Sequence, residues 1–373
     1  TVQFQENEGL SIGANGNAGA LQAEKAIFTP YDTLNQWSGI KFYDNSNDGG
    51  SFLDSCLIER SIGNGILFEN ASPTVINNTI QKNEFGMNLE SGSSPIISGN
   101  YFLNNMFPIR TYSRNIDENL YDNVYTDNID ANGNSSDYIY VYGNMDDYRL
   151  AENKTYDWLA DGAPYRMMEN THVWKDGNEE QIAVLKIYPG ATLVFEQDKY
   201  ITIGHSNNDV ILAGALQADG VTFTSIDTST TWNAIYFYNG TNDDLTTLEN
   251  SVFEYASDAA IYCTNYADPT VINNTFRNNV RGVRVNVDGG APLVAGNTFT
   301  GNQIPIYTFS RNIDENLYDN VYTDNVDENG NSSNYIYVYG TQDNDWRLAE
   351  NKTYDWLADG APYRMMENTH VWK

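Results

Sequence analysis

A long internal duplication constrains this chain more than any other feature of its sequence. The segment from Arg149 to Lys175 recurs without a change from Arg347 to Lys373. A second match begins at Ser113 and at Ser310, about 197 residues further on. Self-similarity at a fixed separation is the signature of a repeat architecture, in which one structural unit is used again. The sequence therefore predicts two tandem units of about 197 residues, as the separation of Ser113 and Ser310 indicates.

The duplication also suggests where the units divide. We expect a first unit at residues 1–175 and a second, continuous with it, at residues 176–373. Thr1 aligns with Thr192 and Lys373 with Lys175, so neither end coincides with a unit border. This favours a piece of a longer array, or units that associate end to end.

A shorter period lies inside each unit. The pattern Asn-x-apolar-x-x-Asn begins at Asn78 and returns after 22 and then 23 residues. Short alternating segments such as Val75-Ile76 lie between the asparagines. A period of this length with short strands predicts one turn of a parallel β-solenoid, in which each turn stacks on the one before.

The asparagines have a physical role in such a coil. Asparagine tolerates left-handed backbone angles at a corner, and its amide can bond the same amide one turn away, about 4.8 Å along the stack. We therefore expect a ladder of stacked asparagines, which satisfies the polar groups of the bends. The predicted rungs are Asn78, Asn100, Asn123, Asn274, Asn297 and Asn320.

Several segments resemble those of a known superfamily. They are the INNT segments at Ile76 and Ile272 and the strand entries that begin at Trp37 and Trp232. With them the chain resembles the right-handed parallel β-helix, or pectate-lyase-like, superfamily, and in its repetition the surface proteins of that kind. The resemblance implies an all-β, right-handed parallel β-helix (solenoid). Enzymes of this superfamily cleave acidic polysaccharides, with clustered carboxylates or with calcium and a base.

Charge limits the class of partner. Asp and Glu total 50 against 20 Lys and Arg, which gives a net charge of −30. Such a chain repels nucleic acid and anionic membranes, because it adds negative charge near phosphate and releases no counterions. No apolar run approaches the roughly 20 residues that span a bilayer, so membrane insertion is not expected. Cys56 and Cys263 occupy different positions in their units and are not expected to pair.

The sequence assigns no catalytic residues. His205 lies in a polar turn and has no counterpart in the first unit. Arg281 and Arg284 align with Phe85 and Asn88, and either line a groove for an anionic sugar or belong to a solvated strand face. Because a catalytic site is needed once and rod geometry in every unit, the duplication favours a non-enzyme.

Two kinds of polar loop are candidates for ligands. Asp44, Ser46 and Asp48 place oxygen atoms at alternate positions before a turn glycine, which predicts a calcium site, although Ser55 stands where a bidentate glutamate would complete it. Plain acidic turns are the alternative. Sequons in polar turns predict glycosylation, and those at Asn77 and Asn273 are expected to be buried in the ladder. The candidate glycan sites are Asn134, Asn153, Asn331 and Asn351.

Tyrosines at alternate positions indicate a partner surface. If Ile139 and Val141 point inward, the neighbouring tyrosines form an outer stripe. Such a stripe suits a neighbouring molecule or a sugar ring, and coverage by the loop at residues 144–148 is the alternative. The residues are Tyr138, Tyr140 and Tyr142, with their copies Tyr335, Tyr337 and Tyr339.

Taken together, these features predict a non-catalytic structural repeat protein. We expect an elongated extracellular rod, part of a cell-surface filament, sheath or adhesin stalk, that self-associates end to end or laterally or continues in a longer array. The alternative is a carbohydrate-binding or polysaccharide-degrading β-helix protein.

Overall fold

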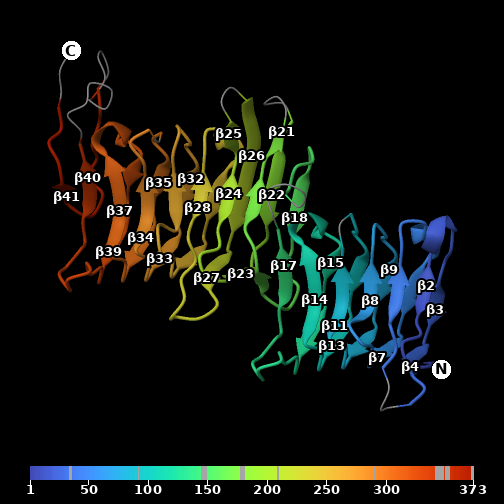
Figure 1. The fold of residues 1–373 in the computed structure, drawn as a ribbon. Helices are drawn as coiled ribbons and strands as arrows, with labels where there is room; N and C mark the ends of the chain where they lie inside the picture. The colour runs from blue at the N-terminus through green and yellow to red at the C-terminus, as the bar shows by residue number, and fades with distance from the viewer. Residues whose placement is uncertain are drawn as a thin grey trace. The chain divides into compact units, whose positions relative to one another are not determined.

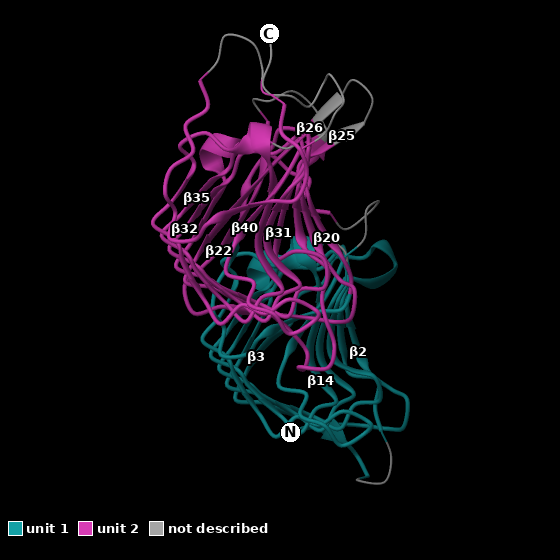
Figure 2. Ribbon diagram, turned by 90° about the vertical axis from the view of Figure 1, so that its left-hand side faces the viewer, with its two compact units in different colours: residues 1–148, 157–168 teal, residues 149–156, 169–373 magenta. Residues whose placement is uncertain are grey.

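The computed structural model describes residues 1–32, 36–90, 92–143, 149–176, 181–207, 210–288, 290–340, 348 and 353–370. The chain forms parallel strands that wind through successive turns, and its elements follow one another in the order shown in Figure 1. Two compact units are present, and Figure 2 distinguishes them by colour. Unit 1 contains Thr1–Tyr148 and Asp157–Met168, and unit 2 contains Arg149–Tyr156 and Glu169–Lys373. The repeat border expected at residues 175 and 176 remains a prediction.

In unit 1, three series of parallel strands run along the coil, here called sheets 1, 2 and 3. Sheet 1 consists of β1 (Val2–Phe4), β4 (Ile27–Pro30), β7 (Leu57–Glu59), β10 (Thr79–Gln81), β13 (Tyr101–Leu103) and β16 (Val124–Thr126). Sheet 2 consists of β2 (Leu10–Ile12), β5 (Ile40–Phe42), β8 (Asn64–Phe68), β11 (Phe85–Leu89), β14 (Phe107–Tyr112), β17 (Ile139–Tyr142) and β19 (Tyr165–Met167). Sheet 3 consists of β3 (Gln22–Glu24), β6 (Phe52–Asp54), β9 (Thr74–Ile76), β12 (Ile96–Ser98) and β15 (Leu120–Tyr121).

Unit 2 repeats this arrangement. Its sheet 1 consists of β23 (Thr192–Phe195), β27 (Thr222–Ser225), β30 (Val252–Glu254), β33 (Thr275–Arg277), β36 (Thr298–Thr300) and β39 (Val321–Thr323). Its sheet 2 consists of β20 (Thr171–Val173), β24 (Ile201–Ile203), β28 (Ile235–Phe237), β31 (Ile261–Cys263), β34 (Arg281–Val285), β37 (Ile304–Phe309), β40 (Ile336–Tyr339) and β41 (Tyr363–Met365). Its sheet 3 consists of β22 (Ala183–Ile187), β26 (Val210–Asp219), β29 (Thr247–Glu249), β32 (Thr270–Ile272), β35 (Leu293–Ala295) and β38 (Leu317–Tyr318).

A few elements depart from this plan. Strand β26 also forms antiparallel pairs with β21 (Lys175–Asp176) and β25 (His205–Asn207). Strand β18 (Thr155–Trp158) contributes residues to both units. Short 3-10 turns occur at η1 (Ala14–Gly16), η2 (Asp48–Gly50), η3 (Ser113–Asn115), η4 (Asp243–Leu245) and η5 (Ser310–Asn312).

The period of the sequence is the period of the coil. Thr79 of β10 lies beside Leu57 of the preceding turn and Tyr101 of the following one, in parallel register. Each turn passes once through each sheet, and around the asparagine columns residues 22 or 23 positions apart stack on one another. Turns with longer connections stack residues 26 or 30 positions apart, as Val2 on Phe28 and Leu10 on Ile40 show. The expected parallel solenoid is therefore the observed fold.

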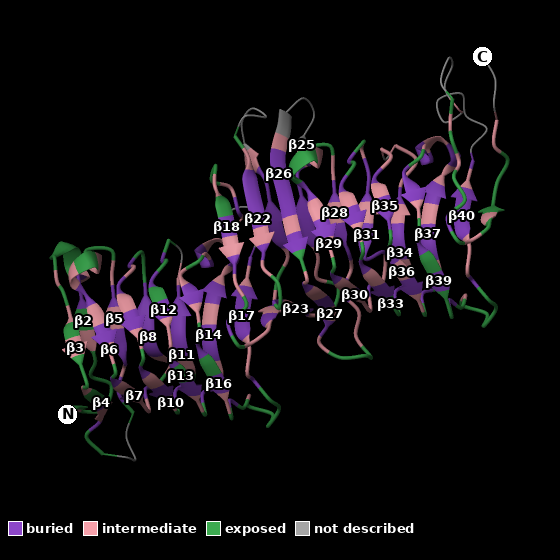
Figure 3. Ribbon diagram, turned by 180° about the vertical axis from the view of Figure 1, so that it is seen from behind, coloured by how far each residue is buried: buried purple, intermediate pink, exposed green. Residues whose placement is uncertain are grey.

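Aliphatic and aromatic side chains fill the interior of each unit, and the buried residues follow the strands in Figure 3. Because strand residues alternate between faces, one apolar side chain per strand is enough to continue the core. In sheet 1 of unit 2 the inward position is an aromatic stack with ring centroids 4.8–5.3 Å apart. Its members are Phe223, Phe253, Phe276, Phe299 and Tyr322.

The predicted asparagine ladder is present in both units. Asn78 donates its backbone N–H and its side-chain amide to Oδ1 of Asn100, each at 3.0 Å. Asn100 repeats these bonds toward Asn123, and all three residues are buried. In unit 2 the equivalent column is Asn274, Asn297 and Asn320.

The structure corrects two details of the ladder. The rung asparagines do not adopt left-handed angles; the residue before each rung does, as Asn77 shows with φ 57°. Asn77 and Asn273 consequently lie exposed at the corners rather than buried in the ladder. The closing asparagine of the same sequence pattern forms a second column, which starts at Asn83 and passes through Asn105.

Candidate functional site

The outer side of sheet 2 in unit 2 carries a row of large polar and aromatic side chains. Ile261 and Val283 pair in register and point into the core, where both are fully buried. The next residue along each strand, Tyr262 and Arg284, therefore lies on the outer side, where both are partly exposed. Register places Tyr236 before them and Tyr307 after them.

Ring contacts join this row across successive turns. The rings of Tyr236 and Tyr262 are 5.3 Å apart, and the Arg284 guanidinium lies 4.3 Å from the Tyr262 ring. Arg284 also lies 5.5 Å from the ring of Tyr307, which stacks on Tyr339 at 4.3 Å. We call the outer residues Tyr236, Tyr238, Tyr262, Arg281, Arg284, Tyr307, Phe309 and Tyr339 the aromatic face.

A histidine–tryptophan group continues the aromatic face toward β20. His205 contacts Tyr238 edge to face at 5.9 Å and Trp174 at 5.2 Å. His172 packs against Trp174 at 4.8 Å, and burial lowers the pKa of His172 to about 4. This imidazole is therefore neutral near pH 7 and extends the row as an uncharged ring.

One carboxylate balances two cations on the aromatic face. Oδ1 of Asp258 accepts a hydrogen bond from Arg281 at 3.0 Å and another from Arg284 at 2.8 Å. The side chains of the three residues are 24–26% exposed. Desolvation raises the pKa of the Tyr262 and Tyr307 phenols, so both stay protonated and can donate hydrogen bonds at neutral pH.

The first unit folds in the same way without this row. Lys41, Leu67, Asn88 and Arg110 occupy the matching outer positions of β5, β8, β11 and β14. The inward positions keep their aliphatic character, as in Ile40, Ile66 and Ile109, which correspond to Ile235, Ile261 and Ile306. The coil thus needs the inward residues in both copies. Tyr43, Tyr112 and Tyr142 of the first copy match Tyr238, Phe309 and Tyr339, so it is the central residues Tyr236, Tyr262, Arg284 and Tyr307 that distinguish the second copy.

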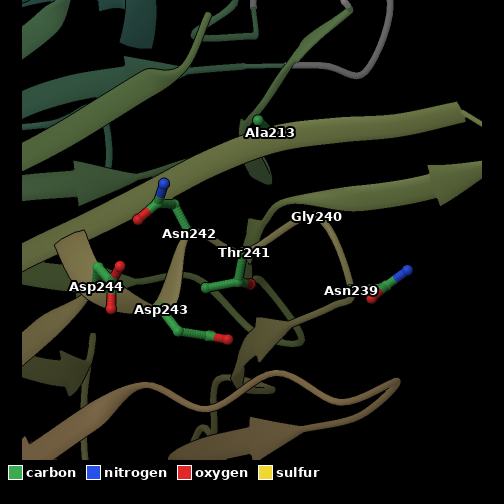
Figure 4. Close-up of a pocket in the computed structure, with 7 residues that line it drawn as sticks. All are labelled: Ala213, Asn239, Gly240, Thr241, Asn242, Asp243 and Asp244. Carbon is green, nitrogen blue, oxygen red and sulfur yellow. The ribbon is translucent and has the colours of Figure 1, made fainter. Parts of the chain in front are cut away.

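A polar pocket of about 300 Å³ is lined mainly by the loop that directly follows Tyr238 in the chain. Figure 4 shows Asp243, Asp244, Asn242 and Thr241 around it. The complete lining is Ala213, Asn239, Gly240, Thr241, Asn242, Asp243 and Asp244.

Asp243 lines the pocket and has a carboxyl group with a shifted pKa. Burial raises its pKa to about 6, and Asp268 nearby adds repulsion. Oδ1 of Asp243 accepts the backbone N–H of Asp268 at 2.8 Å. Near pH 7 the group is mostly ionised and can accept hydrogen bonds from hydroxyl groups.

The pocket loop is the second-unit copy of the predicted calcium loop. Asp44, Ser46 and Asp48 align with Asn239, Thr241 and Asp243. In the first unit Ser46 donates its hydroxyl hydrogen to Oδ1 of Asp48 at 2.5 Å. Within the described ranges no group of three or more His, Cys, Asp or Glu side chains is arranged to hold a metal ion. Calcium at this loop remains a prediction.

The predicted tyrosine stripe is wrong at its centre. Ile139 and Val141 do point inward, but Tyr140 is only 1% exposed and Tyr337 only 5%. Ser136 hydrogen-bonds the Tyr140 hydroxyl, and Phe107 packs edge to face on its ring. In both copies the loop just before the strand therefore bonds the middle tyrosine, as Ser333 does for Tyr337, and in the first copy Phe107 of the preceding turn covers the ring as well.

The outer tyrosines of the two triplets remain partly exposed. They are Tyr138, Tyr142, Tyr335 and Tyr339. Tyr339 joins the aromatic face through its stack on Tyr307. The covering loop proposed at residues 144–148 lies outside the described residues.

The candidate glycan sites have mixed surroundings. Asn134 and Asn331 are exposed, and each amide donates to an aspartate of its own turn, Asp130 or Asp327. Asn153 is exposed, and its side-chain oxygen Oδ1 accepts a hydrogen bond from the backbone N–H of Ile182. Asn351 lies outside the described residues. Glycosylation at these positions remains a prediction.

Both cysteines are buried free thiols, as expected. Desolvation raises the pKa of Cys56 and, more strongly, that of Cys263. Neither thiol is therefore an activated nucleophile. Among the described helices, none has the length and apolar character to cross a membrane.

Comparison with known families agrees with the geometry. A family model described as "Right handed beta helix region" matches residues 6–156 and 205–354. The chain belongs to this right-handed β-helix family, and the expected fold class is confirmed. Comparisons with curated proteins and with solved structures returned no match.

Sequence reasoning found only part of the site. It singled out His205, Arg281 and Arg284, and the structure brings all three to the outer side of sheet 2 or to its border. It did not find Tyr236, Tyr262 or Tyr307, although their replacement by different residues in the first copy was a usable signal.

Proposed function

We propose that the protein is a non-catalytic β-helical repeat protein of the cell surface whose second unit binds carbohydrate along the aromatic face. The coil supplies a regular backbone, and the outer side of sheet 2 supplies the recognition surface. Self-association into a filament or sheath belongs to the same proposal, because both copies keep the residues that maintain the coil.

One observation carries the carbohydrate assignment: the central residues of the aromatic face are partly exposed, and the first copy carries other residue types in their place. These residues are Tyr236, Tyr262, Arg284 and Tyr307. Sugar rings present C–H surfaces that pack against aromatic rings, and hydroxyl groups that need polar partners. Tyr262 and Tyr307 offer such rings, with Arg284 between them. The polar pocket at Asp243 adds carboxylate, amide and hydroxyl groups for hydrogen bonding.

Replacement by the first copy's own residues tests this. In the full chain, Tyr236→Lys, Tyr262→Leu and Tyr307→Arg introduce what the first unit carries at these registers. Screening on a glycan array followed by calorimetry should show at least a tenfold loss of affinity. Each aromatic contact contributes about 0.5–1.5 kcal/mol beyond its buried area, and the variant removes three rings.

The matched control exchanges residues on another side. Arg277→Gln and Thr300→Leu also introduce first-copy residues, but in sheet 1. The control should bind as the unchanged protein does, and both variants should keep their circular dichroism spectrum and melting temperature. Equal binding by the triple variant, or no glycan binding by the unchanged chain, would refute the carbohydrate proposal.

A polysaccharide-cleaving activity is the second candidate, favoured by Asp243. A carboxyl with a pKa near 6 in a polar pocket has the property of a general acid or base. Reducing-end and unsaturated-product assays on polysaccharides test this, with Asp243→Asn as the variant that should abolish turnover. If the Asp243→Asn variant forms product at the same rate as the unchanged chain, Asp243 is not the acid or base.

Surface localisation and assembly are tested on native material. The net charge of −30 predicts self-repulsion that salt screens, so association should rise with ionic strength. Sedimentation at low and high salt, with electron microscopy of the source material, measures it. A monomer at every salt concentration would contradict self-association.

A further inference from the structure

The outer side of sheet 1 in unit 1 exposes apolar side chains in rows. Strands β7, β10, β13 and β16 each bury their middle residue, so the residues on either side of it lie outside. Strand β4 buries Phe28 in the same way, with Ile27 and Thr29 outside. Ile27, Tyr101 and Val124 are 37%, 54% and 41% exposed. The outer residues, here called the sheet 1 face, are Ile27, Thr29, Leu57, Glu59, Thr79, Gln81, Tyr101, Leu103, Val124 and Thr126.

This face carries little charge, although the net charge of the chain is −30. Among its residues, all of which the structure describes, only Glu59 is charged. Oε1 of Glu59 accepts the Thr29 hydroxyl hydrogen at 3.1 Å, and Oε2 accepts the Gln81 amide at 2.7 Å. A molecule that covers the face therefore meets a single carboxylate, whose oxygens already accept hydrogen bonds from the neighbouring rows.

The other two outer sides of unit 1 are more highly charged. Sheet 3 pairs Glu24 with Asp54 in register, and sheet 2 carries Lys41 and Arg110. A symmetric contact between two copies brings the same patch of each together, so like charges would face one another on these sides. Sheet 1 is therefore the side on which unit 1 meets least repulsion from a second copy.

The second copy carries smaller, hydroxylated residues on the same face. Because these side chains lie outside the core, unit 2 builds its sheet 1 with threonine there, and the coil does not require apolar residues at these positions. Exposed apolar area that the fold does not require is typical of an interaction surface. The exchanged pairs are Ile27 and Thr222, Tyr101 and Thr298, and Leu103 and Thr300.

We propose that the sheet 1 face of unit 1 is the lateral contact through which one copy of this chain binds a second copy, face to face about a twofold axis. The inference rests on the proposed self-association and names the surface that makes it. The apolar rows of one copy pack on those of the other. In a twofold contact the middle row, at Thr79, lies opposite its own copy.

The size of the face predicts a weak contact that depends on salt. Strands of three residues, stacked about 4.8 Å apart, give a face of about 20 Å by 10 Å. This is smaller than the roughly 800 Å² per partner of a standard interface. The apolar contact therefore exceeds the repulsion between two acidic chains only where salt screens their charges.

Sedimentation equilibrium of the full chain at high protein concentration tests this in about 1 M sodium chloride, where the Debye length is about 3 Å. The unchanged chain should dimerise. Ile27→Thr with Tyr101→Thr and Leu103→Thr introduces the second copy's own residues and should weaken dimerisation at least tenfold. The control Phe52→Thr with Ile96→Leu makes the same kind of exchange on the outer side of sheet 3 and should associate as the unchanged chain does.

The outcomes separate this surface from self-association itself. Dimerisation that the triple variant retains, with an unchanged circular dichroism spectrum, overturns the surface and leaves self-association standing. Equal weakening by the sheet 3 control overturns it as well. A monomer at every salt and protein concentration overturns both proposals.

Chemical cross-linking tests the centre of the contact without altering its apolar residues. Thr79→Cys places a thiol in the middle row, whereas Cys56 and Cys263 are buried. Packed sheet faces lie about 10 Å apart, so the short thiol cross-linker bismaleimidoethane should join two copies in high salt. Thr74→Cys, on the outer side of sheet 3, is the control and should remain monomeric. Equal yields from the two variants, including no product from either, overturn the twofold contact, and this result decides the matter if the triple variant fails to fold.

Discussion

Asn100 donates two hydrogen bonds to a single atom of Asn123, from its backbone N–H at 2.9 Å and from its side-chain amide at 3.0 Å, both to Oδ1. The same pair of bonds recurs from Asn78 to Asn100. Each rung thereby satisfies a corner N–H that the parallel sheets leave unpaired. The ladder is therefore part of the backbone hydrogen-bond network of the coil.

Asn100→Ala should lower the free energy of unfolding by about 3 kcal/mol or more, because it leaves the donors of Asn78 and the carbonyl of Val75 unsatisfied in a buried site. Urea denaturation measures the loss. The side chain of Asn132 is exposed and has no hydrogen-bond partner among the described residues, so Asn132→Ala should change stability by less than about 0.5 kcal/mol. Equal effects of the two substitutions would contradict the ladder's role.

Asp161 ends the first column and predicts a pH effect. It is fully buried, accepts the bonds of Asn123 and Tyr125, and burial raises its pKa to about 6. The unfolded chain has a carboxyl pKa near 4, so the folded state binds the proton more tightly. This group's contribution to stability is therefore present below about pH 4 and is lost as the pH rises through about 6.

Asp161→Asn together with Asp359→Asn, the same change in the second copy, should flatten the stability profile between about pH 4 and pH 7. Thermal unfolding across this range measures it. Asp127→Asn with Asp324→Asn removes two exposed charges and should leave the slope in place. If both pairs flatten the profile alike, general charge repulsion and not the buried carboxyls would be responsible.

Close backbone packing predicts a sharp difference between glycines. A Cβ on Gly86 would lie 2.5 Å from the carbonyl oxygen of Pro108, so Gly86→Ala should cost about 1–3 kcal/mol. At Gly49 a Cβ meets nothing within 4 Å, and Gly49→Ala should be neutral or slightly stabilising. Melting temperatures of the two variants provide the comparison, and similar values would count against the observed packing.

The first copy shows which other residue the aromatic stack of unit 2 can accept. Ile80 occupies the position in the first copy that Phe276 occupies in the second. Phe276→Ala opens a cavity between Phe253 and Phe299 and should cost about 3–5 kcal/mol. Phe276→Ile should cost less than about 1.5 kcal/mol, because the first copy packs this residue there. Chemical denaturation separates the two, and a larger loss for isoleucine would be evidence against equivalent cores.

The sequence predicted the coil because its period is local and repeated. Steps of 22 and 23 residues between Asn78, Asn100 and Asn123 are also the spacing of stacked rungs in the structure. Burial of single tyrosines was not predictable in this way. Alternation along the strand predicts an outward Tyr140, yet Ser136 of the loop that leads into the strand and Phe107 of the preceding turn cover it. Such coverage depends on how loops fold back, which strand periodicity does not encode.

The aromatic face could not be predicted from the sequence periodicity for a related reason. Tyr236, Tyr262 and Tyr307 are far apart in the chain and become neighbours only through the register of their strands. The pocket at Asp243 was not predicted. Its first-copy relative at Asp48 was considered only as part of a calcium site or a plain acidic turn. Comparison of the two copies position by position would have revealed the outer row.

The direction of the asparagine columns has a genetic consequence. Every rung accepts from the turn before and donates to the turn after, so any two rungs fit each other as well as adjacent ones do. Loss or gain of a coding segment for one whole turn, 22 or 23 residues, re-forms the same bonds across the new junction. Longer turns of 26 or 30 residues occur as well, with the extra residues in the connections between strands. Chains of this type should therefore differ in length by whole turns or by changes within these connections.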